Sequence, residues 1–243
     1  MAYQDFAAVY DRMMADVDYA GLCDRMLTLL QRRGHTPRLV LDAACGTGSF
    51  TKQLADHGLD VIGVDCSEEM LNAARTKLEG RSVLLLCQDL CRLDLYGTVD
   101  TVFCTLDGLN HLTDKRALKT ALRRIALFLE PGGFFVFDVN TLYKHQHILG
   151  NNTFVMEEDG LFAVWQNGPG PAGIVQIDLE IFVAEGERYT RLRESFPERA
   201  YSSAEWRKML QATGFALLGW YDFDTLGPVR KTGEKMICVA RRV

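Results

Sequence analysis

Three acidic residues, Asp42, Asp65 and Asp89, each stand at the end of a short apolar run in the first half of the sequence. A loop of small residues follows Asp42 at once and contains Gly46 and Gly48. Glycines this close together after a strand let the backbone approach a nucleotide closely. Three carboxylates nearby would repel a pyrophosphate, but they suit a ligand with a ribose diol, an amino group and a positively charged centre.

The spacing of the glycines distinguishes between kinds of nucleotide-binding loop. The dinucleotide fingerprint has a third glycine three residues after the second, and this chain has Thr51 at that position. A phosphate-binding P-loop requires Gly-Lys-Ser/Thr, and Lys52 is not preceded by a glycine. The pattern therefore disfavours both a nicotinamide dinucleotide and a nucleoside triphosphate.

Alternating strand and helix patterns between residues 39 and 140 are expected to position these acids. Short apolar runs are separated there by segments whose apolar residues recur at helical spacing, such as the segment after the N-cap candidate Ser67. This alternation predicts an α/β fold with a doubly wound, mostly parallel sheet and helices on both faces. The carboxyl ends of parallel strands meet at one edge of such a sheet, which is where ligands bind.

A second pattern follows the last of these strands. In the stretch 173–183 apolar and polar residues alternate, which is the period of a half-buried antiparallel strand, and a short turn leads into a partner strand. Residues 143–201 are therefore predicted to form a small antiparallel β insertion, placed as a lid on the acceptor side. Residues 1–142 and 202–243 are predicted to form the ligand-binding domain, with residues 1–35 as a helical cap.

Composition restricts the class of protein. The 243 residues are 48% hydrophobic and 24% charged, as in an ordinary globular protein, and the net charge of −5 argues against a general nucleic-acid binder. The seven cysteines are scattered without zinc-like spacing, so free thiols and no metal site are expected. The start has no signal-peptide pattern, and no apolar run approaches the ~18 residues of a membrane span. We expect a cytoplasmic monomer or homodimer without nucleic-acid or membrane partners.

Residues 39–141 resemble a class I S-adenosylmethionine-dependent methyltransferase. The resemblance is carried by the order and spacing of "LDAACGTGSF", "GVDCSEEML", "CQDL", "TLDGLNHL" and "LEPGGFFVFDVNT". The last helix and strand pair also resemble the family, and "YQDFAAVYD" resembles the N-terminal cap of a subgroup of small, single-chain bacterial members. The resemblance implies a Rossmann-like seven-stranded sheet, S-adenosylmethionine as the methyl donor, S-adenosylhomocysteine as the product, and a small-molecule methyl acceptor.

The resemblance also assigns roles around the donor. Asp42 would help to hold the methionyl ammonium, Asp65 would accept hydrogen bonds from both ribose hydroxyls, and Asp89 would accept one from the adenine amino group. Cys66 and Met70 would pack on the adenine faces, where polarizable sulfur suits an aromatic ring. The cofactor-binding residues implied in this way are Tyr10, Asp42, Ala44, Gly46, Gly48, Asp65, Cys66, Met70, Asp89, Leu90, Thr105, Leu106 and Asp107. One departure is Ala44, because the family usually has glycine there, and its methyl group is expected to shift the loop slightly.

The sequence contains fewer motifs that indicate the methyl acceptor or a catalytic group. In-line transfer from a sulfonium requires mainly alignment and exclusion of water, and a base is needed only where the acceptor must lose a proton. We find no base signature, and the Asn-Pro-Pro-Tyr motif for amino groups of nucleic-acid bases is absent. The candidates for a catalytic group are His111, Tyr10 and Asp107, and the candidates for acceptor contacts are Asn110, His111, Arg191 and Arg193.

Two predictions concern surfaces that cover the site. Arg191 and Arg193 share one strand face, which predicts an anionic acceptor if that face looks into the pocket; a solvated face beside Glu180 or Glu194 is an equal alternative. At the start of the chain, Tyr3, Phe6 and Tyr10 lie at helical spacing, and Tyr10 and Asp11 either close over the methionine end of the donor or merely anchor a helix.

Two other functions remain open from the residues alone. One is a methyltransferase-fold protein that binds the cofactor, or a modified form of it, without ordinary methyl transfer. The other is an NAD-dependent oxidoreductase. The missing third glycine and the closing strand hairpin both count against that second function.

Overall fold

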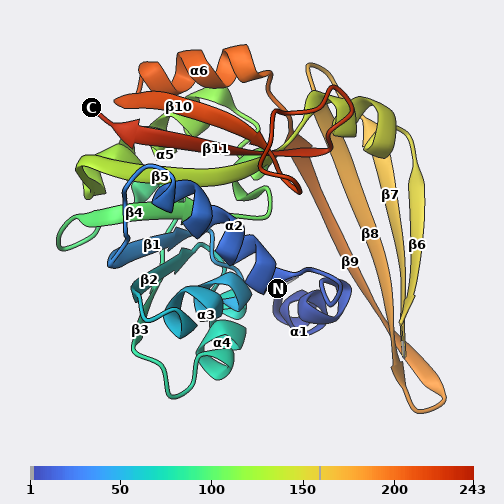
Figure 1. Ribbon diagram of the computed structural model, residues 1–243. Coiled ribbons are helices and arrows are strands. Elements are labelled where there is room, and N and C mark those ends of the chain that lie inside the picture. The colour runs from blue at the N-terminus through green and yellow to red at the C-terminus, as the bar shows by residue number, and fades with distance from the viewer. Residues whose placement is uncertain (1–2, 159) are drawn as a thin grey trace.

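The computed structural model describes residues 3–158 and 160–243, with only the backbone described for residues 3–5 and 8. Its main element is a seven-stranded sheet (Figure 1), whose strands in chain order are β1 (Leu39–Ala43), β2 (Asp60–Asp65), β3 (Val83–Cys87), β4 (Val99–Cys104), β5 (Leu129–Asn140), β10 (Phe215–Asp222) and β11 (Lys235–Arg242). The strand order is β10-β11-β5-β4-β1-β2-β3. Neighbouring strands from β1 to β5 run parallel, and β11 runs antiparallel to β5 and β10. The predicted doubly wound, mostly parallel sheet is confirmed.

Helices cover both faces of the main sheet (Figure 1). The α-helices are α1 (Tyr3–Met13), α2 (Tyr19–Gln31), α3 (Ser49–Asp56), α4 (Glu68–Lys77), α5 (Lys115–Phe128) and α6 (Ser203–Gln211), and the short turns are η1 (Leu90–Arg92), η2 (Gly108–His111) and η3 (Lys144–Leu149). The Ser67 hydroxyl accepts a hydrogen bond from the Met70 amide (3.2 Å), so α4 begins at the predicted N-cap. None of the described helices is both long and apolar enough to cross a membrane.

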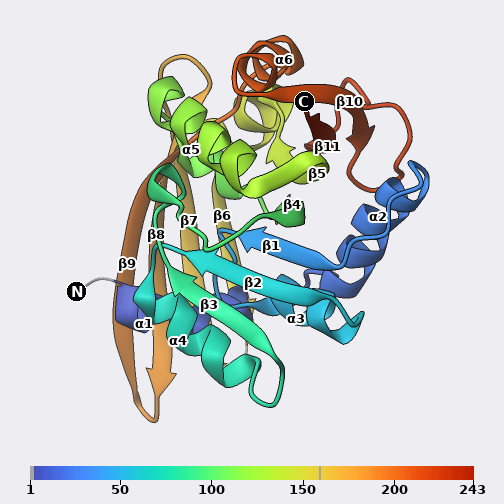
Figure 2. The same cartoon turned by 90° about the vertical axis from the view of Figure 1, so that its left-hand side faces the viewer.

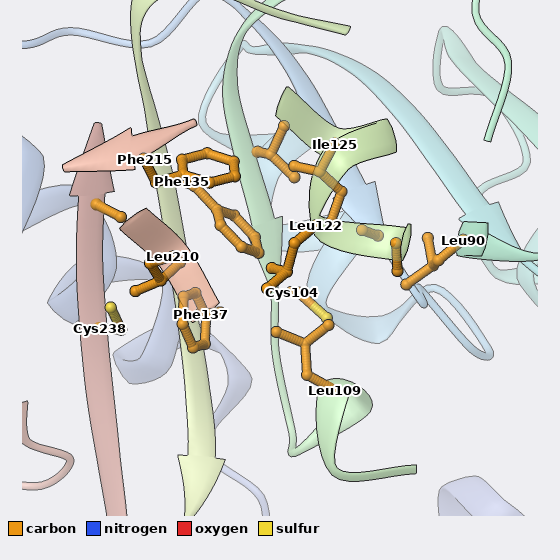
Figure 3. Close-up of a cluster of buried hydrophobic side chains, with 14 of the residues drawn as sticks. Leu90, Cys104, Leu109, Leu122, Ile125, Phe135, Phe137, Leu210, Phe215 and Cys238 are labelled. Carbon is orange, nitrogen blue, oxygen red and sulfur yellow. The ribbon is translucent and has the colours of Figure 1, made fainter. Parts of the chain in front are cut away.

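Two hydrophobic clusters hold the helices on the sheet. On one face, α2 and α3 bury Met26 and Phe50 against strand residues such as Val40. On the other face, α5 and α6 bury Leu122 and Leu210 against the aromatic side chains of β5 (Figure 3). Both faces of the central strands are therefore covered by apolar side chains, and the buried acids Asp42 and Asp138 lie near the carboxyl ends of their strands.

A separate four-stranded antiparallel sheet stands beside the carboxyl edge of the main sheet (Figures 1 and 2). Its strands are β6 (Thr153–Glu158), β7 (Leu161–Pro169), β8 (Ile174–Glu185) and β9 (Arg188–Arg199), in that order. One face packs against α1, where Phe6 and Val9 contact a cluster that includes Ile177 and Leu179. The alternation in 173–183 therefore forms a half-buried strand, as predicted, and α1 lies between the two sheets.

Candidate functional site

The loop after β1 turns through three left-handed residues. Ala44, Gly46 and Gly48 have φ angles of 60°, 53° and 77°. A Cβ atom added at Gly46 would meet no atom within 4 Å, whereas one at Gly48 would lie 3.0 Å from the Cβ of Ala74. Gly48 is thus required by packing against α4, while Gly46 presents bare backbone to open space, as a close approach by a ligand requires.

Ala44 keeps the conformation for which glycine is usual. A left-handed alanine costs about 1 kcal/mol relative to glycine. Its methyl group is accommodated at Gly108, where an added Cβ would lie only 3.1 Å from the Cβ of Ala44. The loop after β1 and the turn after β4 are therefore packed directly against each other.

Asp65 is fixed by the backbone of two neighbouring elements. Its Oδ2 accepts a hydrogen bond from the Gly46 amide (2.8 Å) and its Oδ1 accepts one from the Ser67 amide (2.9 Å). Each carboxylate oxygen has a second lone pair, so both can still accept a hydroxyl. The carboxylate is therefore held in one orientation between the glycine loop and the start of α4.

Asp42 lies beneath the same loop and is completely buried. Its Oδ2 accepts a hydrogen bond from the Thr51 hydroxyl (2.6 Å), and its Oδ1 has no partner. Burial raises the pKa of Asp42 to about 7, against the opposing effect of the Thr51 bond. A buried acceptor without a partner fits a ligand that brings an ammonium group or a bound water.

The side expected to hold adenine is built from the ends of β2 and β3. Asp89 caps η1, and its Oδ1 accepts a hydrogen bond from the Cys91 amide (2.7 Å). Leu90 is buried, Cys66 is exposed, and Met70 packs against the cluster formed by α1 and the small sheet. These positions are compatible with the assigned adenine contacts, which remain predictions.

The N-terminal helix is tied to the glycine loop. The carboxylate of Asp11 accepts hydrogen bonds from the Thr47 hydroxyl (2.6 Å) and the Lys77 ammonium (2.7 Å). On the preceding residue, burial raises the pKa of Tyr10 above its usual range, and Tyr19 adds to that effect. The Phe6 and Tyr10 rings are in edge-on contact with centroids 5.7 Å apart. The side chain of Tyr3, the third aromatic residue of the predicted face, lies outside the described residues.

A buried polar network occupies the carboxyl ends of β4, β5 and the start of β11. Leu106 and Asp107 have left-handed φ angles of 53° and 57°, and their amides donate to the two carboxylate oxygens of Asp138 (2.6 and 3.1 Å). The Asp107 carboxylate accepts from Lys235 (2.5 Å) and from the Asn140 amide group (3.0 Å). Asp138 therefore fixes the turn, and Lys235 compensates the charge of Asp107.

The acids and lysines of this network shift one another's pKa values. Burial by itself would raise the pKa of Asp107, but the ammonium groups of Lys235 and Lys144 outweigh burial and hold that pKa below its usual range. Burial raises the pKa of Asp138 despite the nearby Lys235. The pKa of Lys235 lies above its usual range, because Asp107 and Asp138 together outweigh desolvation. Asp107 and Lys235 are therefore an ionised pair at neutral pH.

The turn η2 brings Asn110 and His111 against β9. Asn110 is buried; its Oδ1 accepts from the Asn140 backbone amide (3.1 Å) and its Nδ2 donates to the Arg199 carbonyl (2.8 Å). The His111 side chain is about half exposed, and its Nε2 lies 3.9 Å from Oε1 of Glu198. Asn110 thus joins the two sheets, whereas His111 has an exposed part that can meet a ligand.

Of the two alternatives for Arg191 and Arg193, the structure shows the solvated face beside Glu180 and not the face that looks into the pocket. Their Nε atoms lie 2.6 and 2.7 Å from the carboxylate of Glu180, and their side chains are 54% and 74% exposed. Successive residues of a strand point to opposite faces, so the inward face carries Leu192 and Glu194 instead. The anionic acceptor inferred from these arginines therefore loses its basis.

Several residues of the network were not found from the sequence. Asp138 and Asn140 interrupt the apolar run of β5 at its carboxyl end, and that interruption is a signal that could have pointed to them. Glu198 and Lys235 approach from β9 and β11, which are distant in the chain and carry no local signal. The described residues contain no group of His, Cys, Asp and Glu side chains that could hold a metal ion.

Known proteins resemble this chain in sequence and in structure. Residues 40–133 match the methyltransferase domain family. The protein named "Putative methyltransferase YqeM" from Bacillus subtilis (strain 168) is 33% identical over 220 residues, which cover 89% of this chain and 87% of that protein. A relative from Geobacillus sp. (strain WCH70), also named a methyltransferase, is 30% identical over the full length of both chains.

Among solved structures, an S-adenosylmethionine-dependent methyltransferase from Clostridium acetobutylicum ATCC 824 has a TM-score of 0.89 and 32% identity, with 100% of this chain and 99% of that chain covered. The similarity thus extends over the glycine loop, the strand-end acids, the N-terminal helix and the small sheet together. With the matching sequence relatives, it shows that the chain belongs to the S-adenosylmethionine-dependent methyltransferases.

Proposed function

We propose that this methyltransferase acts on a small-molecule acceptor held between the turn after β4 and the inward face of β9. The observation that carries the proposal is the approach of His111 to Phe196 and Glu198. The His111 and Phe196 rings have centroids 5.1 Å apart, and Glu198 is buried beside them. These groups adjoin the turn at Asp107, which packs on the glycine loop through Gly108 and Ala44.

The cofactor contacts form part of the same proposal. Asp65 holds the ribose hydroxyls, the free Oδ1 of Asp42 meets the methionyl ammonium directly or through water, and Gly46 gives the backbone access that the donor requires. Thr105, Leu106 and Asp107 lie beside the reacting end. This arrangement rests on the orientation of Asp65, the orphaned oxygen of Asp42 and the open space at Gly46.

The protein's contribution to the reaction is alignment and exclusion of water. The donor sulfonium supplies an already activated methyl group, so the acceptor atom has to be held in line with it. The small sheet covers the acceptor side, and α1 covers the methionine side through Asp11, Thr47 and Lys77. Because the small sheet lies close to partly buried polar groups, the covered site suits a small-molecule acceptor better than a polymer. A cytoplasmic location and a monomeric or homodimeric state remain predictions.

The acceptor can be identified with the intact purified protein. The protein is incubated with a deuterated-methyl donor and a bacterial metabolite extract, and the products are examined by mass spectrometry. We expect at least one small molecule to gain the labelled methyl group, and the Asp65→Ala variant to lose that product at limiting donor concentration.

Two outcomes would contradict the proposal. Binding of S-adenosylhomocysteine without any labelled product would favour the cofactor-binding alternative. Label that enters only protein or nucleic acid in a whole-cell extract would exclude the small-molecule acceptor. The family relationship does not favour an NAD-dependent oxidoreductase.

A further inference from the structure

Glu198 is a buried acid on the inward face of β9 that neither the glycine loop nor the strand-end acids require. Its side chain is 6% exposed, although it comes from the small sheet rather than the cofactor-binding sheet. The Asn140 side chain donates a hydrogen bond to Oε2 (2.9 Å), and Nε2 of His145 lies 3.6 Å from the same oxygen. Oε2 therefore accepts a hydrogen bond from Asn140, whereas Oε1 faces Nε2 of His111 at 3.9 Å.

The partners of Glu198 are themselves held in place. Asn140 also donates to Asp107 (3.0 Å) and accepts from Lys144 (3.0 Å), while Nδ1 of His145 lies 2.9 Å from the Gly173 carbonyl. A carbonyl oxygen only accepts, so Nδ1 of His145 carries the proton of that bond. In neutral His145 the lone pair is therefore on Nε2, which has no hydrogen-bond partner. The bond from Asn140 thus sets the orientation of the Glu198 carboxylate and leaves Oε1 directed to His111.

His111 has the position of a group that can exchange a proton with a ligand. Its side chain is 48% exposed, and one side of the ring is covered by Phe196 at a centroid distance of 5.1 Å. When one ring nitrogen of a histidine donates to a carboxylate, the other is left with a lone pair. A buried acid behind a half-exposed imidazole is the arrangement that orients a general base.

We propose that Glu198 is a positioning residue that holds His111 as the base for an acceptor whose reacting atom carries a proton, such as an ammonium or a hydroxyl. This inference rests on the function proposed above. The X–H bond of the acceptor breaks and its proton passes to Nδ1 of His111. The electron pair left on X forms the new bond to the methyl carbon, while the carbon–sulfur bond breaks and its pair stays on sulfur. The contact of 3.9 Å is expected to shorten in the complex, as catalytic hydrogen bonds often do.

The first test uses the wild-type protein. The chain has only five histidines, so ¹⁵N-labelled histidine gives a simple NMR spectrum, in which the loss of signals in His111→Asn assigns His111. In the complex with S-adenosylhomocysteine at mildly alkaline pH, we expect the tautomer with the proton on Nε2 and the lone pair on Nδ1. The opposite tautomer would overturn the proposal, and this result does not depend on the folding of any Glu198 variant.

The second test exploits the hydrogen bond from Asn140. In Glu198→Gln the amide oxygen must take the position of Oε2 to accept from Asn140, so the amide NH₂ faces His111. We expect the His111 proton to move from Nε2 to Nδ1 and labelled product to fall about 100-fold, the lower range for a lost general base. The matched control Glu198→Asp retains the charge and is expected to keep the wild-type tautomer.

Different results would contradict the proposed function and the proposed role of Glu198. If wild type binds S-adenosylhomocysteine but forms no labelled small molecule, the proposed function fails, whereas the tautomer still decides whether Glu198 orients His111. If Glu198→Gln keeps the wild-type tautomer or full product formation, the role of Glu198 is refuted while the methyltransferase remains. The affinity for S-adenosylhomocysteine should stay the same in both Glu198 variants, because neither removes a predicted cofactor contact.

Discussion

At the scale of single residues, Asp65 and Asp42 differ in how many of their carboxylate oxygens already accept a hydrogen bond from the protein. Asp65 has a backbone partner on each oxygen and can still accept two hydroxyl groups. Asp42 has one satisfied oxygen and one orphaned oxygen in a fully buried position. We therefore expect Asp65 to act mainly on ligand affinity, and Asp42 to couple ligand binding to pH.

Replacing Asp65 with alanine should weaken the binding of S-adenosylhomocysteine by about 2 to 4 kcal/mol, the range for losing charge-assisted hydrogen bonds in a buried site. The melting temperature without ligand should change far less. Isothermal titration calorimetry measures the first quantity and thermal denaturation the second. Asp60→Ala, at the exposed opposite end of the same strand, is the matched control. Equal affinities in the two variants would assign Asp65 to the loop alone.

Asp42 should make the ligand-free protein less stable as the pH rises. Its pKa is raised from 3.8 to about 7, so the folded state binds more protons than the unfolded state between these values. The stability that this group contributes is present below about pH 4 and is lost as the pH rises through about 7, a change of at most about 4 kcal/mol. In urea denaturation across this range, the free energy of unfolding of wild type should fall relative to that of Asp42→Asn as the pH rises. The same pH dependence of the free energy of unfolding in both proteins would contradict the raised pKa of Asp42.

At the scale of elements, α1 joins the glycine loop, α4 and the small sheet. The ion pair of Asp11 with Lys77 connects it to α4, and Phe6 and Val9 connect it to the inward face of the small sheet. A terminal helix that is held by the polar contacts of Asp11 and by apolar contacts to the small sheet can open without disrupting the main sheet. This element is accordingly the one we expect to respond to the donor.

Residues 3–15 should gain protection from hydrogen exchange when S-adenosylhomocysteine binds. Asp11→Ala should speed up exchange in this helix and accelerate ligand dissociation, because it removes the bonds to Thr47 and Lys77. Asp16→Ala, in the exposed turn that follows, is the control. Equal protection with and without ligand would show a permanently packed helix and would exclude the function as a lid.

At the scale of the whole molecule, buried polar contacts made by Asn110 and Asn140 join the two sheets near the reaction site. Asn110 accepts from the backbone of β5 and donates to the backbone of β9 from a single buried amide. This joint keeps His111 and Glu198 facing each other across two separately formed sheets. The position of the acceptor-side groups therefore depends on an assembled interface rather than on one element.

Asn110→Ala should lower the free energy of unfolding by about 2 to 3 kcal/mol, because two buried backbone groups lose their partner. The loss can be measured by urea denaturation, with Gln31→Ala at the exposed end of α2 as the control. We also expect the His111 tautomer to become mixed, since β9 is no longer fixed to the turn. A variant as stable as wild type would show that the Asn110 hydrogen bonds do not contribute to joining the sheets.

The sequence by itself determined the main sheet, the glycine loop at Gly46 and Gly48, and the acids at the strand ends, because local periodicity and turn chemistry specify where strands end. It also identified the family, because several motifs occur in the right order. It did not decide which face of β9 is buried, since a two-residue alternation gives two equivalent faces until a partner covers one. Only the tertiary structure turned Arg191 and Arg193 to solvent and brought Glu198, Asn140 and Lys235 together with Asp107 and His111, because those contacts join strands that are far apart in the chain.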